Sequence, residues 1–474
     1  MAPKNDFTQV AVIGAGPGGY AAAFRAADLG LQVALIDLEA NPGGVCSFRG
    51  CIPSKALLHV AKILSETREA AEIGLEFAPP RIDLSKIRQW KEKVVSQLTQ
   101  GAGGLGKMRK VNFIQGRASF IDSKTLAVQP NGAGNQNRLS FDYAIVATGS
   151  RPFIPPDLSV ESDRLWNSTS ALELKEIPES LLVVGGGYIG LELGTVYAAL
   201  GSRVSVVEMT EGLLPGVDRD LVRILQKRVE KRFDSLRFNM RVSRMREAKG
   251  GLQVSFEEGG KTTEESFEKV LVAVGRKPNS SGLGLSNTSV EADAKGFLRV
   301  DAERRTSVPH IFAIGDVAGE PMLAHKATHE GITAAEVIAG GKAVFEPKAI
   351  PAVVFTDPEI AWCGLTETRA RELGTEVNVS RFPWGASGRA ITLNRNDGST
   401  KILSDPDTDR VLGVGIVGSG AGDLISEGVL AMELGATSAD LCMTIHPHPT
   451  LSETLMESAE GIHGMSLHFY KPKK

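Results

Sequence analysis

The stretch Val10-Ala11-Val12-Ile13-Gly14-Ala15-Gly16-Pro17-Gly18-Gly19 decides the fold of the first part of this chain. Its apolar residues predict a buried β-strand, and the glycines that follow predict a tight turn into a helix. A helix-like stretch, Tyr20 to Leu29, ends at Gly30, and a second apolar run, Val33 to Ile36, closes on Asp37. The order of strand, glycine-rich turn, helix and strand predicts a βαβ unit of a parallel sheet.

The same arrangement occurs again later in the chain. Leu181 to Val184 runs into a second glycine-rich turn, and its helix reaches Leu200. The glycines of this turn are Gly185, Gly187 and Gly190. Val204 to Val207 then closes on Glu208, which lies as far behind its first glycine as Asp37 does. The repeat predicts an α/β fold with two Rossmann-like dinucleotide-binding domains.

Each residue type in these units has a physical role. The first glycine makes the tight turn, the second lets the backbone approach a pyrophosphate, and the third lets the helix pack on the strand. The helix N-terminus favours the anion through its free N–H groups and its dipole. The acid accepts hydrogen bonds from ribose hydroxyls, and an acid at Glu208 favours NAD over NADP. Two such units predict a flavin and a nicotinamide, between which electrons pass.

Two further GxGxxG matches, at Gly101 and Gly413, lack the context of a nucleotide-binding unit. Gly101 follows no predicted strand, and Gly413 follows an apolar run but has no acid at the matching distance. Such matches are weak without their strand and helix. We expect Gly101 to Gly106 to form a flexible loop, and Gly413 to Gly422 a crowded connection between a strand and a helix.

Three more segments fit a plan of two nucleotide domains. Phe141 to Ser150 predicts a strand that ends in Ala147-Thr148-Gly149, and Phe267 to Arg276 predicts one that ends in Gly275-Arg276. A third apolar run, from Ile311, delivers Asp316 at its carboxyl end, where α/β sheets bind ligands. The alternative for Asp316 is a helix cap or a turn.

Composition excludes several classes of protein. The 474 residues predict roughly two to four domains, and a hydrophobic content of 42% excludes a disordered chain. The net charge of −3 points to neither nucleic acid nor a membrane surface. Four cysteines are too few for a secreted disulfide scaffold, so we expect a reducing, cytoplasmic location. Met1 to Gln9 lacks the apolar core of a signal peptide, and Glu192 argues against a membrane span over Leu181 to Gly201.

Cys46 and Cys51 lie in Gly43-Gly44-Val45-Cys46-Ser47-Phe48-Arg49-Gly50-Cys51-Ile52-Pro53-Ser54-Lys55. The proline suits the first turn of a helix, which would place Cys51 near a helix N-terminus, where thiolate is favoured. A redox-active disulfide is compatible with this spacing. The alternatives are two unpaired thiols or a metal site. Zinc would need two more ligands, and Cys363 and Cys442 show no ligand spacing.

Near the C-terminus, Ile445-His446-Pro447-His448-Pro449-Thr450-Leu451-Ser452-Glu453 offers a candidate base. Histidine titrates in the range needed to take a proton from a dithiol, and a carboxylate on its far nitrogen would strengthen it. The alternatives remain open from spacing alone. Thr450 and Glu453 also fit a capping box, and the two histidines fit a surface turn.

Taken together, these motifs resemble the FAD-dependent pyridine nucleotide–disulfide oxidoreductases, and within that family the branch that oxidises dihydrolipoamide. The resemblance covers nearly the whole chain. It includes the motifs already quoted, together with Gly185 to Gly194, Phe312 to Asp316, Pro321-Met322-Leu323-Ala324-His325 and Phe382-Pro383-Trp384.

The resemblance implies two sets of cofactor-binding residues. FAD would be bound by Gly14, Gly16, Gly19, Asp37, Lys55, Ala118, Thr148, Gly149, Asp316, Met322, Leu323 and Ala324. NAD would be bound by Gly185, Gly187, Gly190, Glu208, Gly275 and Arg276. Glu192 would pair with Lys55 beside the flavin ring, and no metal site is expected.

The resemblance also implies the roles of the catalytic residues and the partners. Cys46 would exchange with substrate while Cys51 lies against the flavin, and His448 with Glu453 would come from the partner subunit of a homodimer. His446 would be a structural neighbour. The substrate dithiol would be carried on a lipoyl domain, at the E2 core of a 2-oxo acid dehydrogenase complex or on the glycine-cleavage H-protein.

The resemblance implies four parts: an FAD domain at 1–150, an NAD domain at 151–276, a central segment at 277–348, and a C-terminal α+β dimerisation domain at 349–474. One segment departs from the family. Between the cysteines the family usually carries Leu-Asn-Val-Gly, whereas this chain has Ser47-Phe48-Arg49-Gly50. Phe48 and Arg49 are bulkier, and Arg49 adds a positive charge near the pair. We therefore expect the disulfide to be kept, with a shift in its potential and in substrate access.

The sequence argues against three alternatives to the dihydrolipoamide branch. A glutathione reductase would be expected to carry basic residues near Glu208. A mercuric reductase would be expected to carry a C-terminal cysteine pair, and the segment from His463 to Lys474 contains no cysteine. A flavin-binding scaffold that has lost its redox role would be favoured by a change at one of four residues, and all four are intact: Cys46, Cys51, His448 and Glu453.

Overall fold

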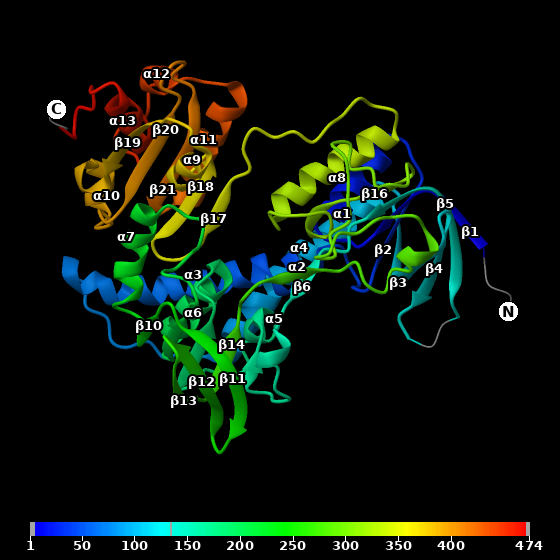
Figure 1. The fold of residues 1–474 in the computed structure, drawn as a ribbon, viewed down its shortest axis with the longest axis horizontal. Coiled ribbons are helices and arrows are strands. Elements are labelled where there is room, and N and C mark those ends of the chain that lie inside the picture. Colours follow the sequence, from blue (N-terminus) through cyan, green and yellow to red (C-terminus); the bar gives the residue numbers. More distant parts are fainter. Residues whose placement is uncertain (1–4, 133–134, 471–474) are drawn as a thin grey trace.

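The computed structural model describes residues 5–132 and 135–470, whose strands and helices form three groups (Figure 1). The first group is a mixed sheet with the parallel order β2-β1-β5-β16 and a hairpin, β3 and β4, that joins β2 to β5. Its strands are β1 (Asn5–Ile13), β2 (Val33–Asp37), β3 (Asn112–Asp122), β4 (Thr125–Pro130), β5 (Asn137–Val146) and β16 (Ile311–Ala313). Its helices α1 (Pro17–Asp28) and α8 (Ala324–Ile338) lie side by side (Figure 1).

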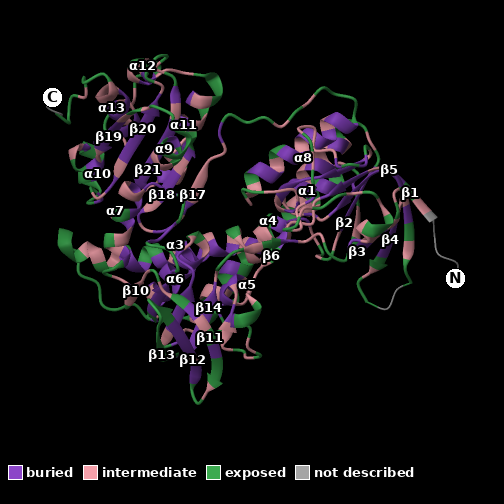
Figure 2. Cartoon of the chain, viewed as in Figure 1, coloured by how far each residue is buried: buried purple, intermediate pink, exposed green. Residues whose placement is uncertain are grey.

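Strand β1 is buried on both faces, which explains its unbroken apolar sequence. Val10 and Val12 pack in one hydrophobic cluster, with alanines of α1 and α8, while Ala11 and Ile13 pack in another on the opposite face. Parallel strands that are covered on both sides carry continuous apolar runs of this kind. Figure 2 shows that burial is concentrated in the sheets and in the helix faces against them.

The second group is a parallel sheet in the order β10-β9-β8-β14-β7 with an antiparallel sheet, β11-β12-β13, beside it. The parallel strands are β7 (Leu165–Trp166), β8 (Ser180–Val184), β9 (Arg203–Val207), β10 (Ser235–Arg237) and β14 (Lys269–Val272). The others are β11 (Arg241–Ala248), β12 (Gly251–Glu258) and β13 (Lys261–Phe267), and the helices are α5 (Ser168–Glu173), α6 (Tyr188–Leu200) and α7 (Arg219–Val229). An antiparallel pair, β6 (Ser150–Pro152) with β15 (Arg276–Pro278), marks where the chain enters and leaves this group.

The third group is an antiparallel sheet in the order β17-β18-β21-β20-β19. Its strands are β17 (Ala352–Val354), β18 (Glu359–Gly364), β19 (Asn378–Pro383), β20 (Ser399–Ser404) and β21 (Val411–Gly418). Its helices are α9 (Glu367–Leu373), α10 (Gly388–Thr392), α11 (Ala421–Leu434), α12 (Ser438–Met443) and α13 (Glu453–Ile462). The predicted fold class, two Rossmann-like units followed by an α+β unit, is confirmed.

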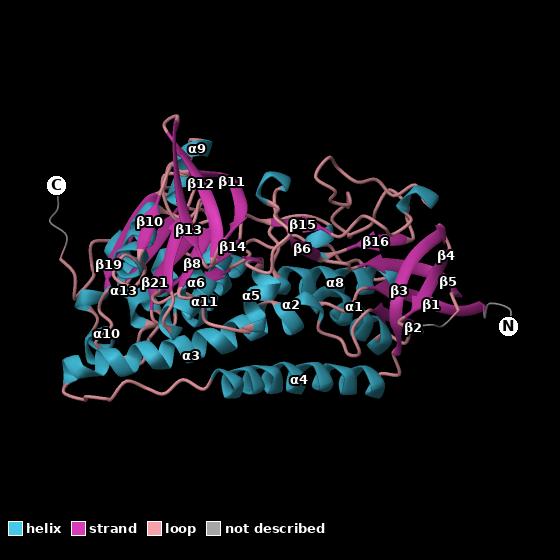
Figure 3. Ribbon diagram, turned by 90° about the horizontal axis from the view of Figure 1, so that it is seen from below, coloured by secondary structure: helices cyan, strands magenta, loops and turns pink. Residues whose placement is uncertain are grey.

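Helices α2 (Gly44–Arg49), α3 (Cys51–Glu69) and α4 (Leu84–Met108) follow the first βαβ unit, and Figure 3 shows α3 and α4 along one side of the molecule. The expected flexible loop over Gly101 to Gly106 is wrong, because these residues form the last turns of α4. A Cβ on Gly103 would lie 2.5 Å from Oδ1 of Asn41, and one on Gly106 would lie 3.2 Å from the ring of Phe24. Close packing therefore outweighs the low helix propensity of glycine here.

The expected crowded connection after Gly413 is confirmed. Gly413 lies in β21, and a Cβ on it would come 2.0 Å from the carbonyl oxygen of Leu365. Short 3-10 helices occur at Ala70–Ile73, Pro156–Leu158, Leu285–Asn287, Gly315–Val317 and Trp384–Ala386. Within the described residues, no helix is both long enough and apolar enough to span a membrane.

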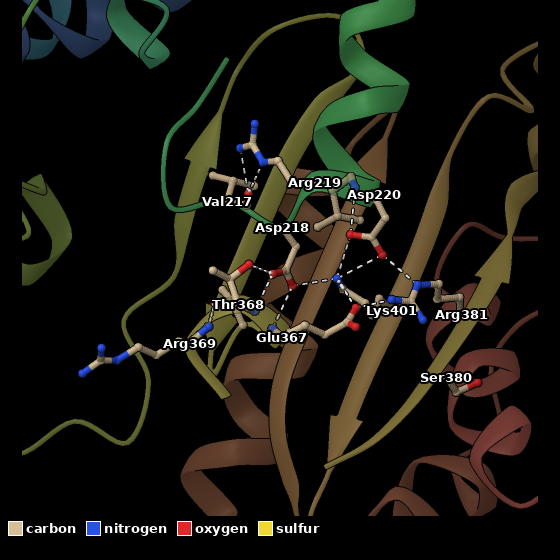
Figure 4. Close-up of polar contacts among 12 residues, drawn as sticks. Val217, Asp218, Arg219, Asp220, Glu367, Thr368, Arg369, Ser380, Arg381 and Lys401 are labelled. Carbon is tan, nitrogen blue, oxygen red and sulfur yellow. Dashed lines mark hydrogen bonds and ion pairs between the residues drawn. The ribbon is translucent and has the colours of Figure 1, made fainter. Parts of the chain in front are cut away.

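A buried lysine joins the second group to the third. Lys401 of β20 is 1% exposed, and its Nζ lies 2.6 Å from Asp218, 2.9 Å from Asp220 and 2.9 Å from Glu367. Figure 4 shows the three carboxylates around this ammonium, with Arg381 beside them. These acids are the one group of three metal-ligating residues found among the described residues, and the lysine occupies its centre.

Candidate active site

The two glycine-rich turns have nearly the same geometry. Gly14 has φ +100°, and a Cβ on it would lie 2.4 Å from the carbonyl oxygen of Ala147. Gly185 has φ +107°, and its Cβ would lie 2.6 Å from the carbonyl oxygen of Ala273. Only glycine fits such a conformation and such a close approach. The repeat seen in the sequence is therefore a repeat of backbone structure as well.

The acid that ends each βαβ unit also holds its own turn. Oδ2 of Asp37 accepts a hydrogen bond of 2.6 Å from the N–H of Ala15, and Oε2 of Glu208 accepts one of 2.7 Å from the N–H of Gly186. Carboxylates have further acceptor sites, which remain suited to ribose hydroxyls. Each acid therefore has to lie within reach of its own glycine-rich turn as well as of a ribose, which explains why the spacing between acid and glycine is equal in the two units.

A cavity of about 320 Å³ opens at the carboxyl ends of β1 and β5 in the first group. Six of the residues expected to bind FAD line it along the glycine-rich turn and the loop after β5: Gly14, Gly16, Gly19, Asp37, Thr148 and Gly149. Five further expected residues line the rest: Lys55, Glu192, Asp316, Met322 and Ala324. The position agrees with the general rule for ligands of open parallel sheets.

Two residues expected in this cavity are not among the residues that line it. The side chain of Ala118, on β3, is 4% exposed and packs in the hydrophobic cluster beneath the sheet. Leu323 lies between Met322 and Ala324, just before α8, but only these two neighbours line the cavity. Side chains of neighbouring residues in an extended segment point to opposite sides, so the side chain of Leu323 points away from the cavity that its neighbours line.

A second cavity, of about 1050 Å³, lies at the matching edge of the second sheet. Five of the residues expected to bind NAD line it: Gly185, Gly187, Glu208, Gly275 and Arg276. Gly190 does not line it, because it packs α6 onto β8: a Cβ there would lie 2.3 Å from the carbonyl oxygen of Gly185. Apart from Arg276 and Met322, which line both cavities, the expected residues found on cavity walls are divided between the two cavities.

The two cavities adjoin each other. Tyr188, Ile189, Arg276 and Met322 line both. Tyr188 and Ile189 were not identified from the sequence, although their position directly after the second glycine-rich turn, at the start of α6, was a usable signal. Burial raises the pKa of Tyr188 to about 12, so its hydroxyl stays protonated and neutral at this junction.

Cys46 and Cys51 lie on the wall of the first cavity. Cys46 belongs to α2 and Cys51 is the first residue of α3, as the sequence predicted for a cysteine at a helix N-terminus. Both are free thiols in this structure. The hydrogen bond from Cys46 and, more weakly, the charge of Lys55 outweigh burial and lower the pKa of Cys51 to about 7, whereas the pKa of Cys46 is raised by the same hydrogen bond and by burial.

The other two cysteines lie elsewhere, in the third group. Cys363 is buried in β18, and burial raises its pKa to about 12. Cys442 belongs to α12. Across the part of the chain that the structure describes, no cluster of three metal-ligating residues includes a cysteine.

Glu192 links three parts of the site. Its Oε2 is 2.9 Å from Nζ of Lys55 and 3.0 Å from Oγ of Ser54, and its Oε1 accepts a hydrogen bond of 3.1 Å from the N–H of Phe355. The ammonium of Lys55 also lies 4.4 Å from the centre of the Phe355 ring. Because Glu192 is almost fully buried in α6, the ion pair fixes the lysine on the wall of the first cavity.

Ser150 connects residues of the two cavities through its hydroxyl. Oγ donates to Oδ2 of Asp316 at 2.5 Å and accepts from Nε of Arg276 at 2.7 Å. Asp316 lies in the 3-10 turn after β16, so the turn and the cavity position predicted for it occur together. Ser150 was not identified from the sequence, because its contacts join segments more than a hundred residues apart.

His448 and Glu453 form the expected pair. Nδ1 of His448 is 2.8 Å from Oε1 of Glu453, whose Oε2 accepts a hydrogen bond of 2.7 Å from the N–H of Thr450. Burial would raise the pKa of Glu453, but this backbone N–H and His448 together lower it, so the carboxylate is charged. The capping box considered for Thr450 and Glu453 does not form, because α13 begins at Glu453 with Ser452 as its N-cap. Glu453 instead binds the N–H of Thr450 and orients the histidine.

The structure does not bring His448 to Cys46 within one chain. Figures 1 and 3 show α13, which begins five residues after His448, in the third group and away from α2, the helix to which Cys46 belongs. The imidazole is 73% exposed. His446, by contrast, has a buried side chain whose Nε2 is 2.7 Å from Glu427, and this contact is the main cause that raises its pKa.

Comparisons with known proteins match this geometry along the whole chain. The family model of the pyridine nucleotide-disulphide oxidoreductases matches residues 8–331, and the model of their dimerisation domain matches residues 350–459. A protein of Haemophilus influenzae named dihydrolipoyl dehydrogenase is 49% identical over 457 residues, 96% of this chain and 95% of its own. A Vibrio cholerae protein of the same name is 49% identical over 96% of each chain.

Solved structures show the same fold. LpdA from Mycobacterium tuberculosis superposes with a TM-score of 0.89 at 28% identity, over 96% of this chain and 99% of its own. The HOCl-induced flavoprotein disulfide reductase RclA from Escherichia coli superposes with a TM-score of 0.84 at 28% identity, over 95% and 99% of the two chains.

Proposed function

This chain belongs to the pyridine nucleotide–disulphide oxidoreductase family, and we propose that it oxidises protein-bound dihydrolipoamide to lipoamide while reducing NAD+. One observation carries the proposal. Cys46 and Cys51 lie on the wall of a cavity that adjoins a second one through Tyr188 and Met322, so a dithiol, a flavin and a nicotinamide can lie in sequence. The choice of dihydrolipoamide is supported by the names of relatives that match over almost their full length.

FAD and NAD+ are the cofactors that fit the two cavities. A dinucleotide pyrophosphate needs close backbone approach, and Gly14 and Gly185 supply it at positions that no other residue tolerates. Asp37 and Glu208 are the matching ribose acceptors, and the acid at Glu208 favours NAD+ over NADP+. When bound, the flavin supplies a two-electron relay between the dithiol and the nicotinamide.

The protein residues perform thiol–disulfide exchange. His448, its tautomer fixed by Glu453, takes a proton from one thiol of the substrate. The resulting thiolate attacks Sγ of Cys46, the Cys46–Cys51 bond breaks, and Cys51 leaves as a thiolate that Lys55 stabilises. The second substrate sulfur, once deprotonated, attacks the mixed disulfide, which releases lipoamide and leaves both cysteines reduced. Glu192 holds the side chain of Lys55 in place through a contact of 2.9 Å.

A homodimer completes this site. His448 lies in the third group, which matches the dimerisation domain, and is separated from Cys46 of its own chain, so we assign the base to the partner subunit. The lipoyl domain of a 2-oxo acid dehydrogenase complex, or the glycine-cleavage H-protein, would carry the substrate. We also propose a cytoplasmic location, and domains at 1–150, 151–276, 277–348 and 349–474.

An anaerobic titration tests the electron path. Dihydrolipoamide added to the purified protein should produce long-wavelength absorbance from a Cys51 thiolate against the flavin, and NAD+ should reverse it with formation of NADH. A Cys46→Ser variant, which keeps Cys51, should show no reduction by dihydrolipoamide. A yellow protein that NADH reduces but dihydrolipoamide does not would refute the proposed substrate and retain the two nucleotide sites.

A further inference from the structure

Arg49 occupies the valine position of the Leu-Asn-Val-Gly segment that the family usually carries. It is the last residue of α2, and its guanidinium forms an ion pair with Glu39, which follows β2. Both side chains are partly exposed, at 41% and 26%. The pair therefore joins two neighbouring segments of the wall of the first cavity, which Arg49 lines together with Asp37 and Leu38.

The cations of the first cavity are unevenly distributed. Among its lining residues they are Arg49, Lys55 and Arg276. Lys55 is paired with Glu192, and Arg276 lies at the junction with the second cavity, where it donates to Ser150. Arg49 is thus the cation at the opposite end, near Asp37.

Helix α2 lies directly beside the first glycine-rich turn. Gly44, its first residue, approaches Gly16 so closely that a Cβ would lie only 2.5 Å from the Cα of Gly16. This turn offers backbone N–H groups to a pyrophosphate but has no cationic side chain from Gly14 to Gly19. Arg49 brings a full positive charge to the wall on which that turn lies.

We propose that Arg49, oriented by Glu39, binds the diphosphate of the flavin dinucleotide. The assignment rests on the FAD cofactor of the proposed function. A guanidinium has five N–H donors in a planar fork, so it can serve Glu39 and a phosphate oxygen together. Because Glu39 already restrains the side chain, less rotamer freedom is lost when the phosphate binds. Arg49 then contributes to cofactor affinity, and the charge that acts on Cys51 is that of Lys55. This assignment replaces the expectation from the sequence that Arg49 shifts the disulfide potential.

The test compares two matched variants, Arg49→Met and Arg25→Met. Arg25 in α1 has the same exposed fraction, 41%, and also pairs with a carboxylate, Glu336, but does not line the cavity. Flavin-free protein is titrated with FAD and with riboflavin, which has no phosphate, and the quenching of flavin fluorescence gives each Kd. The reduction potential of the cysteine pair is measured in the same variants.

Arg49→Met is expected to raise the Kd for FAD about tenfold and to weaken its dependence on salt, because one charge-assisted contact is lost. Its Kd for riboflavin and its cysteine potential should not change, and Arg25→Met should bind FAD like the parent chain. An unchanged Kd for FAD, an equal loss for riboflavin, or a shifted cysteine potential would overturn the assignment. If the parent chain itself does not bind FAD, the proposed function fails rather than the role of Arg49.

Discussion

Nζ of Lys401 lies 2.6 Å from Oδ2 of Asp218, and this buried contact connects β20 of the third group to the start of α7 in the second. The lysine is 1% exposed and the aspartate 5%. At the other end of α7, Arg228 and Arg232 pair with Asp357, which precedes β18. Helix α7 is therefore tied at both ends to the third group, which matches the dimerisation domain of the family.

Lys401→Met should destabilise the protein strongly. Removal of one partner leaves buried carboxylates uncompensated, and such losses cost about 3–5 kcal/mol. Urea unfolding followed by circular dichroism measures the change. Arg369→Met is the matched control, because its pair with Glu372 is exposed at 59% and 57% and should contribute less than about 1 kcal/mol. Equal midpoints for the two variants would contradict a role for Lys401 in holding the groups together.

The free energy of unfolding should fall at acidic pH as Asp357 becomes protonated. Burial would raise its pKa, but Arg395, Arg228 and Arg232 outweigh burial and lower it to about 2. Since the folded pKa lies below the unfolded value of about 4, the stabilisation is present above pH 4 and is lost as the pH falls towards 2. The free energy of unfolding, measured from pH 6 to pH 2.5, should fall less steeply in Asp357→Asn. Parallel pH curves for variant and parent would refute this.

Cys51 should react as a thiolate near neutral pH. In the reduced protein, iodoacetamide labelling of Cys51 followed by mass spectrometry should inflect near pH 7, where its pKa lies. Lys55→Met should move the inflection upward by about one unit, because a neighbouring positive charge is lost. Cys363, whose pKa burial raises to about 12, serves as the internal control and should remain unlabelled. An inflection that Lys55→Met leaves in place would exclude the lysine as its cause.

His448→Gln should abolish most dithiol oxidation without loss of the nucleotide sites. Loss of a general base lowers the rate by about 10²–10⁴-fold. Oxidation of NADH by an artificial electron acceptor does not use this base and should stay within twofold. His446→Gln is the control, because its imidazole is bound to Glu427 inside the chain. A parallel loss in both assays would show damage to the fold instead of loss of a base.

Much of the site was predictable because its residues follow local rules. The two glycine-rich turns lie at predictable strand ends, and Cys51 starts a helix as the following proline indicated. Ala118 and Leu323 were expected in the cavity, but the direction of a side chain on a strand or an extended segment depends on register. Ser150 was missed, since its hydroxyl joins Asp316 and Arg276, which lie more than a hundred residues away in the chain. Tyr188 was missed although it directly follows the second glycine-rich turn, because its place on the walls of both cavities appears only in the structure.

The sequence by itself determined the two βαβ units, their acids and the cysteine pair, because glycine conformation, apolar periodicity and helix N-termini act over a few residues. Only the tertiary structure decided that Gly101 to Gly106 is helical, that Arg49 pairs with Glu39, and that Lys401 lies among three carboxylates. The physical reason is that burial and ion pairing join residues far apart in the chain. The free energy of burial and of ion pairing depends on which surfaces come into contact in the folded chain. A local sequence pattern does not contain that information.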